Sequence, residues 1–406
     1  MERQVTAPPK GPLAGMRVVE LAHIMAGPVC GLMLADMGAD VVKVEKPDGD
    51  DTRRFLPPAI NGVAAAYLMM NRNKRGIALD LKTEGGREAL KTLLAKADVV
   101  IENYRQGTME KLGLGYETLK KLNPGLIYCE ISGFGRTGPY ATRGGFDLIA
   151  QGMSGLMSIT GEGPGRPPVK SGAPISDITA GILGAMGCAA AYAHRLRTGH
   201  GQRVDTSLFE AGITQTYWQS AIAFATGVAP QPMGSAHPLN APYQAFETSD
   251  GWITIGAANQ RNWENFLAVI GAGELARDPR FVDNHSRMQH RQVLTETLKP
   301  VLCRRSSNDW LGRLEAAGVP AGPVLDILQM HADPQTIARE MVVETDHPVA
   351  GRVKTVGLPV KFSATPGAIA RPAPLLGEHT REVLAEAGLE LEAIERLIAA
   401  GAAISR

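Results

Sequence analysis

The chain has 406 residues, with 42 Lys and Arg against 41 Asp and Glu, and a formal net charge of +1. This balance argues against a chain-wide affinity for nucleic acid or for an anionic membrane, while leaving room for a local basic pocket. Hydrophobic residues make up 44% of the sequence, enough for a sizeable core, and the length predicts about two globular domains.

The predicted elements of the first half alternate between short β-branched runs and segments with helical periodicity. The expected strands are residues 17–21, 41–44, 77–81, 98–101 and 126–131, and the expected helices are 28–37, 84–97 and 178–193. This β–α alternation predicts an α/β fold with a mostly parallel sheet and flanking helices.

The pattern changes after about residue 205. We expect a helix at 208–225, a Pro/Gly-rich segment at 227–242, a strand at 252–255, a helix at 262–270, strands at 324–325 and 353–360, and a final helix at 390–399. The chain then divides into residues 1–215, a small domain at 225–315, and residues 320–406, which resume the strand signals of the large domain.

The four cysteines, Cys30, Cys129, Cys188 and Cys303, are far apart in sequence and form no C-x-x-C pair. This spacing argues against a disulfide framework and a cysteine zinc site, so we expect no metal and a reducing, cytoplasmic location. Residues 1–14 lack the apolar segment of a secretory signal. The uncharged run 178–193 is shorter than a membrane span and predicts a buried helix.

Several common catalytic motifs are missing. The nearest matches to a phosphate loop (163–171), a Rossmann glycine fingerprint (22–27) and a nucleophile elbow (152–156) lack a correctly placed glycine, and the histidines form no His-Glu-x-x-His motif. Nucleotide hydrolysis, ordinary hydride transfer, serine hydrolysis and zinc catalysis are therefore disfavoured.

Three other features carry candidate chemistry. The turn 23–28 joins a strand to a helix, where Gly27 and Pro28 would suit close approach of an anion to the helix N-terminus, or simply a tight turn. Cations gather near the predicted strand ends and would suit a polyphosphate-bearing cofactor or a solvated surface: Lys46, Arg72, Lys74, Arg75, Lys82, Arg105, Lys111 and Arg143.

The third feature is Asp177, at the start of the long small-residue helix. Aspartate is a preferred N-cap, so Asp177 could simply cap this helix. A carboxylate held there would also stay ionised, as a carboxylate nucleophile requires. The sequence pattern does not separate the two roles.

Taken together, these stretches resemble family III CoA-transferases from Gly11 to about Ala385. The matching segments are residues 12–18, 26–28, 34–45, 71–75, 102–104, 123–124, 133–135, 138–139, 198–202 and 374–380. Each is weak alone, but the set in this order is specific. The resemblance implies a Rossmann-like large domain built from both chain ends, an inserted small α+β domain, and an interlocked ring homodimer.

The resemblance also implies the site residues. The family's catalytic aspartate falls on Asp177. The positions that contact coenzyme A fall on Met25, Ala26, Lys46, Leu79, Asp80, Leu81, Lys82, Asn103, Tyr104, Arg105, Lys111, Arg143, Gly144, Gly145 and Phe146. Coenzyme A or acyl-CoA is the implied substrate, no metal is needed, and the partner's small domain completes the site.

Two departures refine this hypothesis. Racemases of the family carry a Gly-His-Asp triplet, which here reads Gly145-Phe146-Asp147, and a phenyl ring cannot accept a proton. The small domain lacks a run of consecutive glycines. Its Gly234, Ser235 and His237 are the candidate substrate contacts, and His237 either holds a distal carboxylate or is structural. This version is similar to the succinyl-CoA:glutarate (dicarboxylate) branch.

The expected activity is transfer of CoA from an acyl-CoA donor, succinyl-CoA, to a small dicarboxylic acid through an aspartyl-CoA thioester. The alternatives are an α-methylacyl-CoA racemase or epimerase, which Phe146 disfavours, and an inactive acyl-CoA-binding protein, which the intact Asp177 disfavours.

Overall fold

The computed structural model describes residues 11–406, which form two compact units. The first unit comprises residues 11–155, Ser171–Gln215 and Pro334–Arg406, and the second comprises Leu156–Lys170 and Thr216–Asp333. The segment 156–170, placed by the sequence pattern in residues 1–215, thus clusters with the second unit.

A seven-stranded sheet organises the first unit, in the order β14-β5-β2-β1-β6-β7-β8. Its strands are β1 (Arg17–Glu20), β2 (Asp40–Glu45), β5 (Arg75–Leu79), β6 (Val99–Glu102), β7 (Ile127–Ser132), β8 (Arg203–Ser207) and β14 (Ala403–Ile404). All neighbours pair in parallel except β14, which is antiparallel to β5. The parallel strands therefore follow the doubly wound order, in which the direction of winding reverses between β1 and β6.

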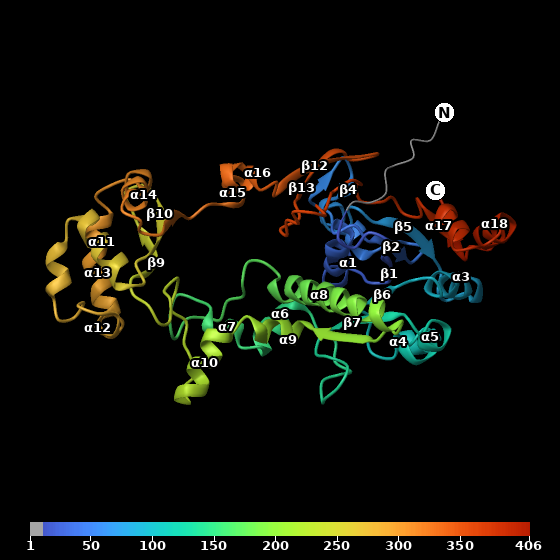
Figure 1. Cartoon of the computed structure of the whole chain (residues 1–406), viewed down its shortest axis with the longest axis horizontal. Helices are drawn as coiled ribbons and strands as arrows, with labels where there is room; N and C mark the ends of the chain where they lie inside the picture. Colours follow the sequence, from blue (N-terminus) through green and yellow to red (C-terminus); the bar gives the residue numbers. More distant parts are fainter. Residues whose placement is uncertain (1–10) are drawn as a thin grey trace. The chain divides into compact units, whose positions relative to one another are not determined.

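Both faces of this sheet are covered, and alternate strand residues point to opposite cores. Val19 and Val100 pack on one side, and Val18 and Ile101 on the other. The first side carries α3 (Glu84–Leu94), α4 (Thr108–Lys111), α5 (Tyr116–Leu122), α17 (Thr380–Glu386) and α18 (Leu391–Ala399). The second carries α1 (Ala26–Asp36), α6 (Asp147–Met153), α8 (Ile175–Thr198) and α9 (Leu208–Thr214). Figure 1 shows α17, from the end of the chain, beside β5 from its first quarter.

Shorter elements complete the first unit. They are the 3₁₀ helix η1 (Asp51–Arg54), the hairpin of β3 (Ala59–Ile60) and β4 (Val63–Ala64), α2 (Ala65–Met70), α16 (Pro334–Ala338), and the hairpin of β12 (Val342–His347) and β13 (Gly351–Val356).

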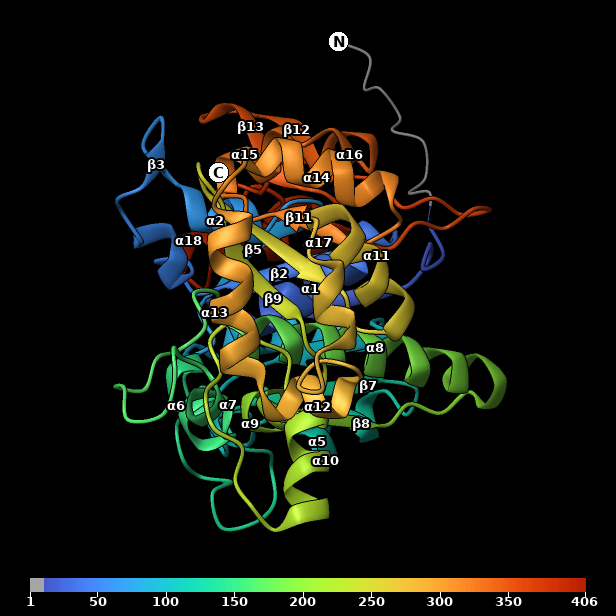
Figure 2. The same ribbon diagram turned by 90° about the vertical axis from the view of Figure 1, so that its left-hand side faces the viewer.

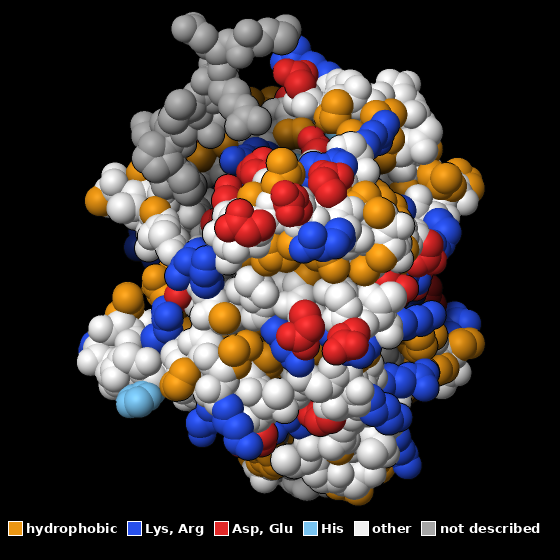
Figure 3. Space-filling model, turned by 90° about the vertical axis from the view of Figure 1, so that its right-hand side faces the viewer, with side chains coloured by type: hydrophobic (Ala, Val, Ile, Leu, Met, Phe, Trp, Pro, Cys, Tyr) orange, Lys and Arg blue, Asp and Glu red, His pale blue; other side chains and the backbone are white. Residues whose placement is uncertain are grey.

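The net charge of the chain is near zero, and on the face of the molecule in Figure 3 basic and acidic side chains are interspersed.

The second unit has its own antiparallel sheet, β11-β10-β9, and its own aromatic core. The strands are β9 (Tyr243–Glu247), β10 (Trp252–Gly256) and β11 (Ala321–Pro323). The helices are α7 (Leu156–Ile159), α10 (Tyr217–Thr226), α11 (Gln260–Ile270), η2 (Gly273–Arg277), α12 (Asn284–Gln289), α13 (Arg291–Leu302), α14 (Ser307–Ala316) and α15 (Ile327–Ala332). Figure 2 shows α13 beside β9. Trp263 and Phe266 of α11 and Leu298 of α13 are fully buried in this core.

The mostly parallel sheet is confirmed, and its five predicted strands lie within about two residues of β1, β2, β5, β6 and β7, whereas β8 and β14 were not predicted. The helix predicted at 208–225 is instead two helices, α9 and α10, and no Gly or Pro marks the break at Gln215–Thr216. The strand predicted at 324–325 is wrong: β11 ends at Pro323, and only the backbone N–H of Val324 continues the pairing, to the carbonyl of Trp252.

Helix α8 is longer than its uncharged core suggested. The run 178–193 lies within a helix of 24 residues, which is long and apolar enough to span a membrane by length and composition. The prediction that the helix is too short for a membrane span is therefore wrong. Yet Ala180, Gly184 and Cys188 are buried where α8 packs on α1 and β7. A Cβ on Gly181 would lie 2.7 Å from Cβ of Val29, so only a small residue allows this contact. We therefore interpret α8 as a helix packed on the sheet.

Candidate active site

A cavity lies at the sheet's carboxyl edge, at the point where the strand order reverses. Its volume is about 480 Å³. Segments that follow β1, β6 and β7 line it, together with the start of α8: His23–Ala26, Asn103–Gln106, Thr108, Arg136, Arg143–Phe146 and Asp177 are the main contributors. Doubly wound sheets bind ligands at this position because the loops after the two central strands diverge there.

Hydrogen bonds from the β6 loop hold the turn after β1 in place. The Asn103 side chain accepts a hydrogen bond from the backbone N–H of His23 at 3.0 Å and donates one to its carbonyl at 2.8 Å. The next residue, Ile24, has φ of 66°, a costly conformation for a β-branched residue that places strain at the cavity wall. Gly27 serves packing: a Cβ there would lie 2.1 Å from Cβ of Ala22. The predicted role of Gly27, close approach to a ligand, is therefore replaced by close approach of α1 to β1.

A second close backbone contact brings residues 143–146 to the cavity. A Cβ on Gly133, just after β7, would lie 2.7 Å from Cα of Gly145. The two backbone segments therefore touch directly, with no side chain between them. The Arg143 guanidinium stacks on Tyr140, 3.9 Å from the ring centroid. The Phe146 side chain is 70% exposed at the cavity wall.

Asp177 lies in the first turn of α8 and faces this cavity. The N-cap of α8 is Pro174, with no side-chain cap bond from that residue, so the capping role considered for Asp177 is wrong. Burial, and then the nearby negative charge of Asp147, raise the pKa of Asp177 to about 7. The expectation that Asp177 stays fully ionised is therefore corrected: near neutral pH it exchanges readily between its two forms.

Five of the eight candidate cations fall into two groups. Arg72, Lys74 and Arg75 precede or open β5 and so lie at its amino end. There they pair with Asp36 at 2.6 Å, Glu20 at 2.8 Å and Asp40 at 2.6 Å. Their predicted role at a cofactor is therefore wrong, because each is a buried partner of a carboxylate. By contrast, Arg105 and Arg143 are exposed at the cavity, and within residues 11–406 neither forms an ion pair.

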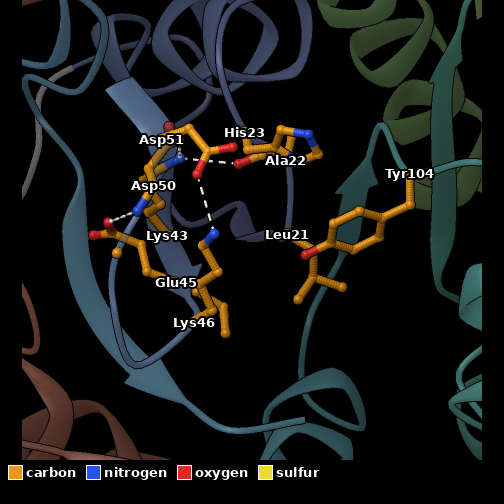
Figure 4. Close-up of a pocket in the computed structure, with 11 residues that line it drawn as sticks. Leu21, Ala22, His23, Lys43, Glu45, Lys46, Asp50, Asp51 and Tyr104 are labelled. Carbon is orange, nitrogen blue, oxygen red and sulfur yellow. Dashed lines mark hydrogen bonds and ion pairs between the residues drawn. The ribbon is translucent and has the colours of Figure 1, made fainter. Parts of the chain in front are cut away.

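A second, smaller cavity of about 210 Å³ adjoins the first, sharing His23, Asp51 and Tyr104 as wall residues. Figure 4 shows Tyr104 across this cavity from Lys46 and Asp51, which pair at 3.0 Å. Beneath it the fully buried Lys43 bonds to Glu20, Asp50 and the carbonyl of Ala22. This network fixes the β1 turn from below.

Comparison with known proteins shows the family of the chain. The model of CoA-transferase family III matches residues 13–380. The chain belongs to this family. It is 42% identical over 394 residues to the succinate–glutarate CoA-transferase of Agrobacterium fabrum, covering 95% of this chain and 97% of that protein. It is 40% identical over 383 residues to the acetyl-CoA:oxalate CoA-transferase of Acetobacter aceti, covering 93% and 96%.

A solved structure agrees with this assignment. The crystal structure of a CAIB/BAIF family protein from Brucella suis matches with a TM-score of 0.84 at 43% identity, covering 93% of this chain and 100% of that one. The resemblance drawn from the sequence is confirmed. As a family III CoA-transferase, the chain is an enzyme that transfers CoA, and its substrates are CoA thioesters.

The structure brings together ten of the residues expected at the CoA-transferase site. The main cavity is lined by Met25, Ala26, Asn103, Tyr104, Arg105, Arg143, Gly144, Gly145, Phe146 and Asp177, while Lys46 lines the adjoining one. Leu79 is buried in β5, and Asp80, Leu81, Lys82 and Lys111 line neither cavity. The roles of all of these residues in CoA binding stay predictions.

The candidate substrate loop belongs to the second unit. There the His237 ring stacks on Tyr243 with 5.0 Å between centroids, and its Nδ1 accepts the backbone N–H of Leu239 at 3.1 Å. Burial lowers the pKa of His237. The Ser235 hydroxyl accepts the N–H of Ala245 at 3.0 Å, and Gly234 has φ of 63°. These contacts hold the loop's own shape, and a substrate role stays a prediction.

Two residues of the site were missed as contributors. Asp147 appeared only as the last member of the triplet 145–147, yet its carboxylate bonds to the start of α8. Arg136 lines the cavity, pairs with Glu102 and Glu130, and donates to the carbonyl of Tyr104 at 3.1 Å. Burial raises the pKa of Glu102 to about 7, against the effect of Arg136. Asp177 is 30 residues from Asp147 and Glu102 is 34 residues from Arg136, so no local pattern signals these two contacts.

Three cysteines that are distant in sequence meet in the core. The sulfur atoms of Cys30, Cys129 and Cys188 lie within 4.8 Å of one another, and they form the one cluster of possible metal ligands in residues 11–406. The wide spacing of the cysteines in the sequence argued against a shared cysteine site, but three of the thiols lie close together in the fold. The thiols are fully buried in the apolar core between α1, β7 and α8, where small sulfur side chains fill space.

Proposed function

We propose that the enzyme moves CoA from an acyl-CoA donor, succinyl-CoA, to a small dicarboxylic acid, with Asp177 as the nucleophile. The observation that carries this proposal is a half-buried carboxylate facing a cavity whose wall also presents two arginines that form no ion pair within the described part of the chain. The carboxylate supplies a covalent attachment point, and the cations suit the phosphates of CoA.

The reaction then proceeds by exchange of acyl bonds. An Asp177 oxygen attacks the donor thioester carbon, the carbon–sulfur bond breaks, and CoA leaves as a thiolate while a mixed anhydride forms. The thiolate attacks the aspartyl carbonyl, which releases the donor acid and leaves an aspartyl-CoA thioester. The acceptor carboxylate attacks this thioester and expels the thiolate, which attacks the acceptor's acyl carbon and regenerates Asp177. One thioester is made for each one broken.

The environment of Asp177 suits these steps. With a pKa of about 7, a large fraction of the carboxylate is ionised near neutral pH and is more basic than an ordinary aspartate. The N-terminus of α1 at Met25–Ala26 presents positive dipole charge to the same cavity, which favours the negatively charged oxygens that form during acyl transfer.

CoA is proposed to lie along the joined cavities. Arg105 and Arg143 would meet phosphates at the larger one and Lys46 at the smaller one, with Lys82 and Lys111 farther along the carboxyl edge. Phe146, exposed at the cavity wall, would pack on the pantetheine arm. The dicarboxylate preference follows the succinate–glutarate relative, whereas the oxalate enzyme shows that acceptors differ within the family.

We also propose the interlocked homodimer, with residues 225–315 as an inserted small domain whose loop at Gly234, Ser235 and His237 contacts the acid. Exposed apolar side chains support a partner: Trp218 and Phe224 on α10, and Met186 on α8, are at least 60% exposed. The four free thiols support a reducing, cytoplasmic location.

The test combines turnover with trapping. Purified protein is incubated with succinyl-CoA and a panel of free acids, and new acyl-CoA is measured; a parallel sample receives hydroxylamine, which converts an aspartyl thioester or anhydride to a hydroxamate. We expect transfer to a dicarboxylate and a hydroxamate on Asp177. Asp177→Ala should abolish both while CoA binding persists, and full activity in that variant would overturn the mechanism. Exchange of the α-proton in deuterated water, without transfer, would support the racemase alternative.

A further inference from the structure

The first turn of α8 is held by a carboxylate from another helix. Asp147 opens α6, directly after the cavity-lining stretch 143–146. Its Oδ1 accepts the backbone N–H of Ser176 at 2.9 Å and that of Asp177 at 3.4 Å. Because the N-cap residue Pro174 offers no side-chain bond, Asp147 satisfies N–H groups that the helix itself leaves open.

Asp147 is itself fixed. The Gln151 amide, one turn along α6, donates to Oδ2 of Asp147 at 2.7 Å, and its carbonyl accepts the backbone N–H of Ser171 at 2.9 Å. Gln151 is 1% exposed, so this link is shielded from water. Helix α6 therefore holds the chain that leads into α8 at both Ser171 and Ser176.

We propose that Asp147 is a positioning residue for CoA transfer, which fixes the first turn of α8 and so directs Asp177 into the cavity. This inference rests on the function proposed above. It adds to the assignment of the nucleophile because it connects two parts of the site. The stretch 143–146, expected to contact CoA, is followed directly by Asp147, which bonds to the backbone of Asp177.

The charge of Asp147 has a second effect. Its carboxylate adds to burial in raising the pKa of Asp177. Asp147→Asn keeps an oxygen that can accept the Ser176 N–H but removes the negative charge, whereas Asp147→Ala removes both. The two variants therefore separate the hydrogen bonds from the electrostatic effect.

The experiment measures kcat, KM for succinyl-CoA and the pH profile of both variants. It also measures the rate at which a carbodiimide labels Asp177, read by mass spectrometry without any turnover. Asp283→Ala is the matched control, because Asp283 also caps a helix, accepting the Ser286 N–H at 2.7 Å in α12. The unfolding temperature of each variant is measured first. All assays are then run well below the lowest of these temperatures.

For Asp147→Ala we expect kcat to fall about tenfold or more, with KM for succinyl-CoA changed less than about twofold, since misorientation affects the reacting group. For Asp147→Asn we expect kcat to stay within about threefold and the acid limb of the rate profile and of labelling to move to lower pH. The control variant Asp283→Ala should change neither kcat nor the pH of the acid limb.

Wild-type kcat in Asp147→Ala would overturn the proposal, as would an unmoved acid limb and labelling profile in Asp147→Asn. An equal loss of kcat in Asp283→Ala would also overturn it, because the effect would then be general destabilisation. Failure of the proposed function looks different: Asp177→Ala would transfer CoA at the wild-type rate. If Asp147→Ala does not fold, the near-isosteric Asp147→Asn carries the test through the labelling of Asp177.

Discussion

Replacing Asp177 by asparagine should stabilise the protein above neutral pH while it abolishes CoA transfer. In the unfolded chain this carboxyl group ionises near its ordinary pKa of 3.8, but in the native state it does so only near 7. As pH rises from about 4 to about 7, the unfolded chain loses its proton first, so the native state becomes progressively less favoured. Asparagine cannot ionise and removes this penalty.

The magnitude follows from the same pKa. A rise from 3.8 to about 7 corresponds to about 4 kcal/mol at a pH above both values. Asp177 is half-buried at an open cavity, so water screens part of this cost, and we expect about 2 kcal/mol for Asp177→Asn at pH 8. Near pH 4 the native carboxyl is protonated while the unfolded one is about half ionised, so the gain should shrink to about 0.5 kcal/mol or less.

The assay is thermal and urea unfolding of both proteins between pH 4 and pH 8. Asp283→Asn is the control of opposite sign. The N–H of Ser286 lowers the pKa of Asp283, so its ionised form is favoured in the native state, and this variant should lose stability at pH 8. If Asp177→Asn gains equally at pH 5 and pH 8, or is destabilised at pH 8, the placement of Asp177 in a desolvated site beside Asp147 is refuted.

Other substitutions separate structural from binding residues. Asn103→Ala removes two hydrogen bonds to the His23 backbone and should cost about 2 kcal/mol in urea unfolding while raising KM for succinyl-CoA; an unchanged KM would show that this turn does not shape the site. Arg72→Met removes the ion-pair partner of the buried Asp36 carboxylate and should lower the free energy of unfolding by about 3–5 kcal/mol. Arg105→Gln should keep the melting temperature and raise KM for succinyl-CoA in a salt-dependent way. Equal stability losses in the two variants would refute the division into structural and cavity-facing arginines. In native protein only Cys303 should react quickly with a disulfide reagent, against four thiols after denaturation, and fast reaction of more than one would contradict the closed core.

The sequence predicted the strands well because their signal is local. Val99–Ile101 is a continuous β-branched run, and Val41–Val44 is one interrupted only by Lys43. Both are buried on both faces, so each is marked without reference to the rest of the chain. The carboxyl edge was predictable for the same reason: residues that follow parallel strands, such as Asn103 and Arg105, meet at one edge whatever the loops do.

Features that depend on which partner a side chain meets were not predictable. Arg72 and Arg105 carry the same charge near strand ends. Arg72 lies before its strand and pairs with Asp36, whereas Arg105 lies after its strand and forms no ion pair within residues 11–406. Cys30 and Cys188 are separated by most of the N-terminal half and meet only because α1 and α8 pack together through small residues. Such pairings are set by tertiary packing, which no window of sequence contains.

The triplet 145–147 places a side chain that cannot accept a proton next to a carboxylate that bonds to another helix. With Phe146 in the middle position the chain has no proton acceptor there, and the exposed ring is free to contact a ligand. The following aspartate bonds to backbone N–H groups of the α8 turn, so its support of Asp177 does not depend on the side chain at 146. The side chain at 146 and the support of the α8 turn can therefore vary independently. The proposed acyl transfer through Asp177 accordingly needs no proton acceptor at residue 146.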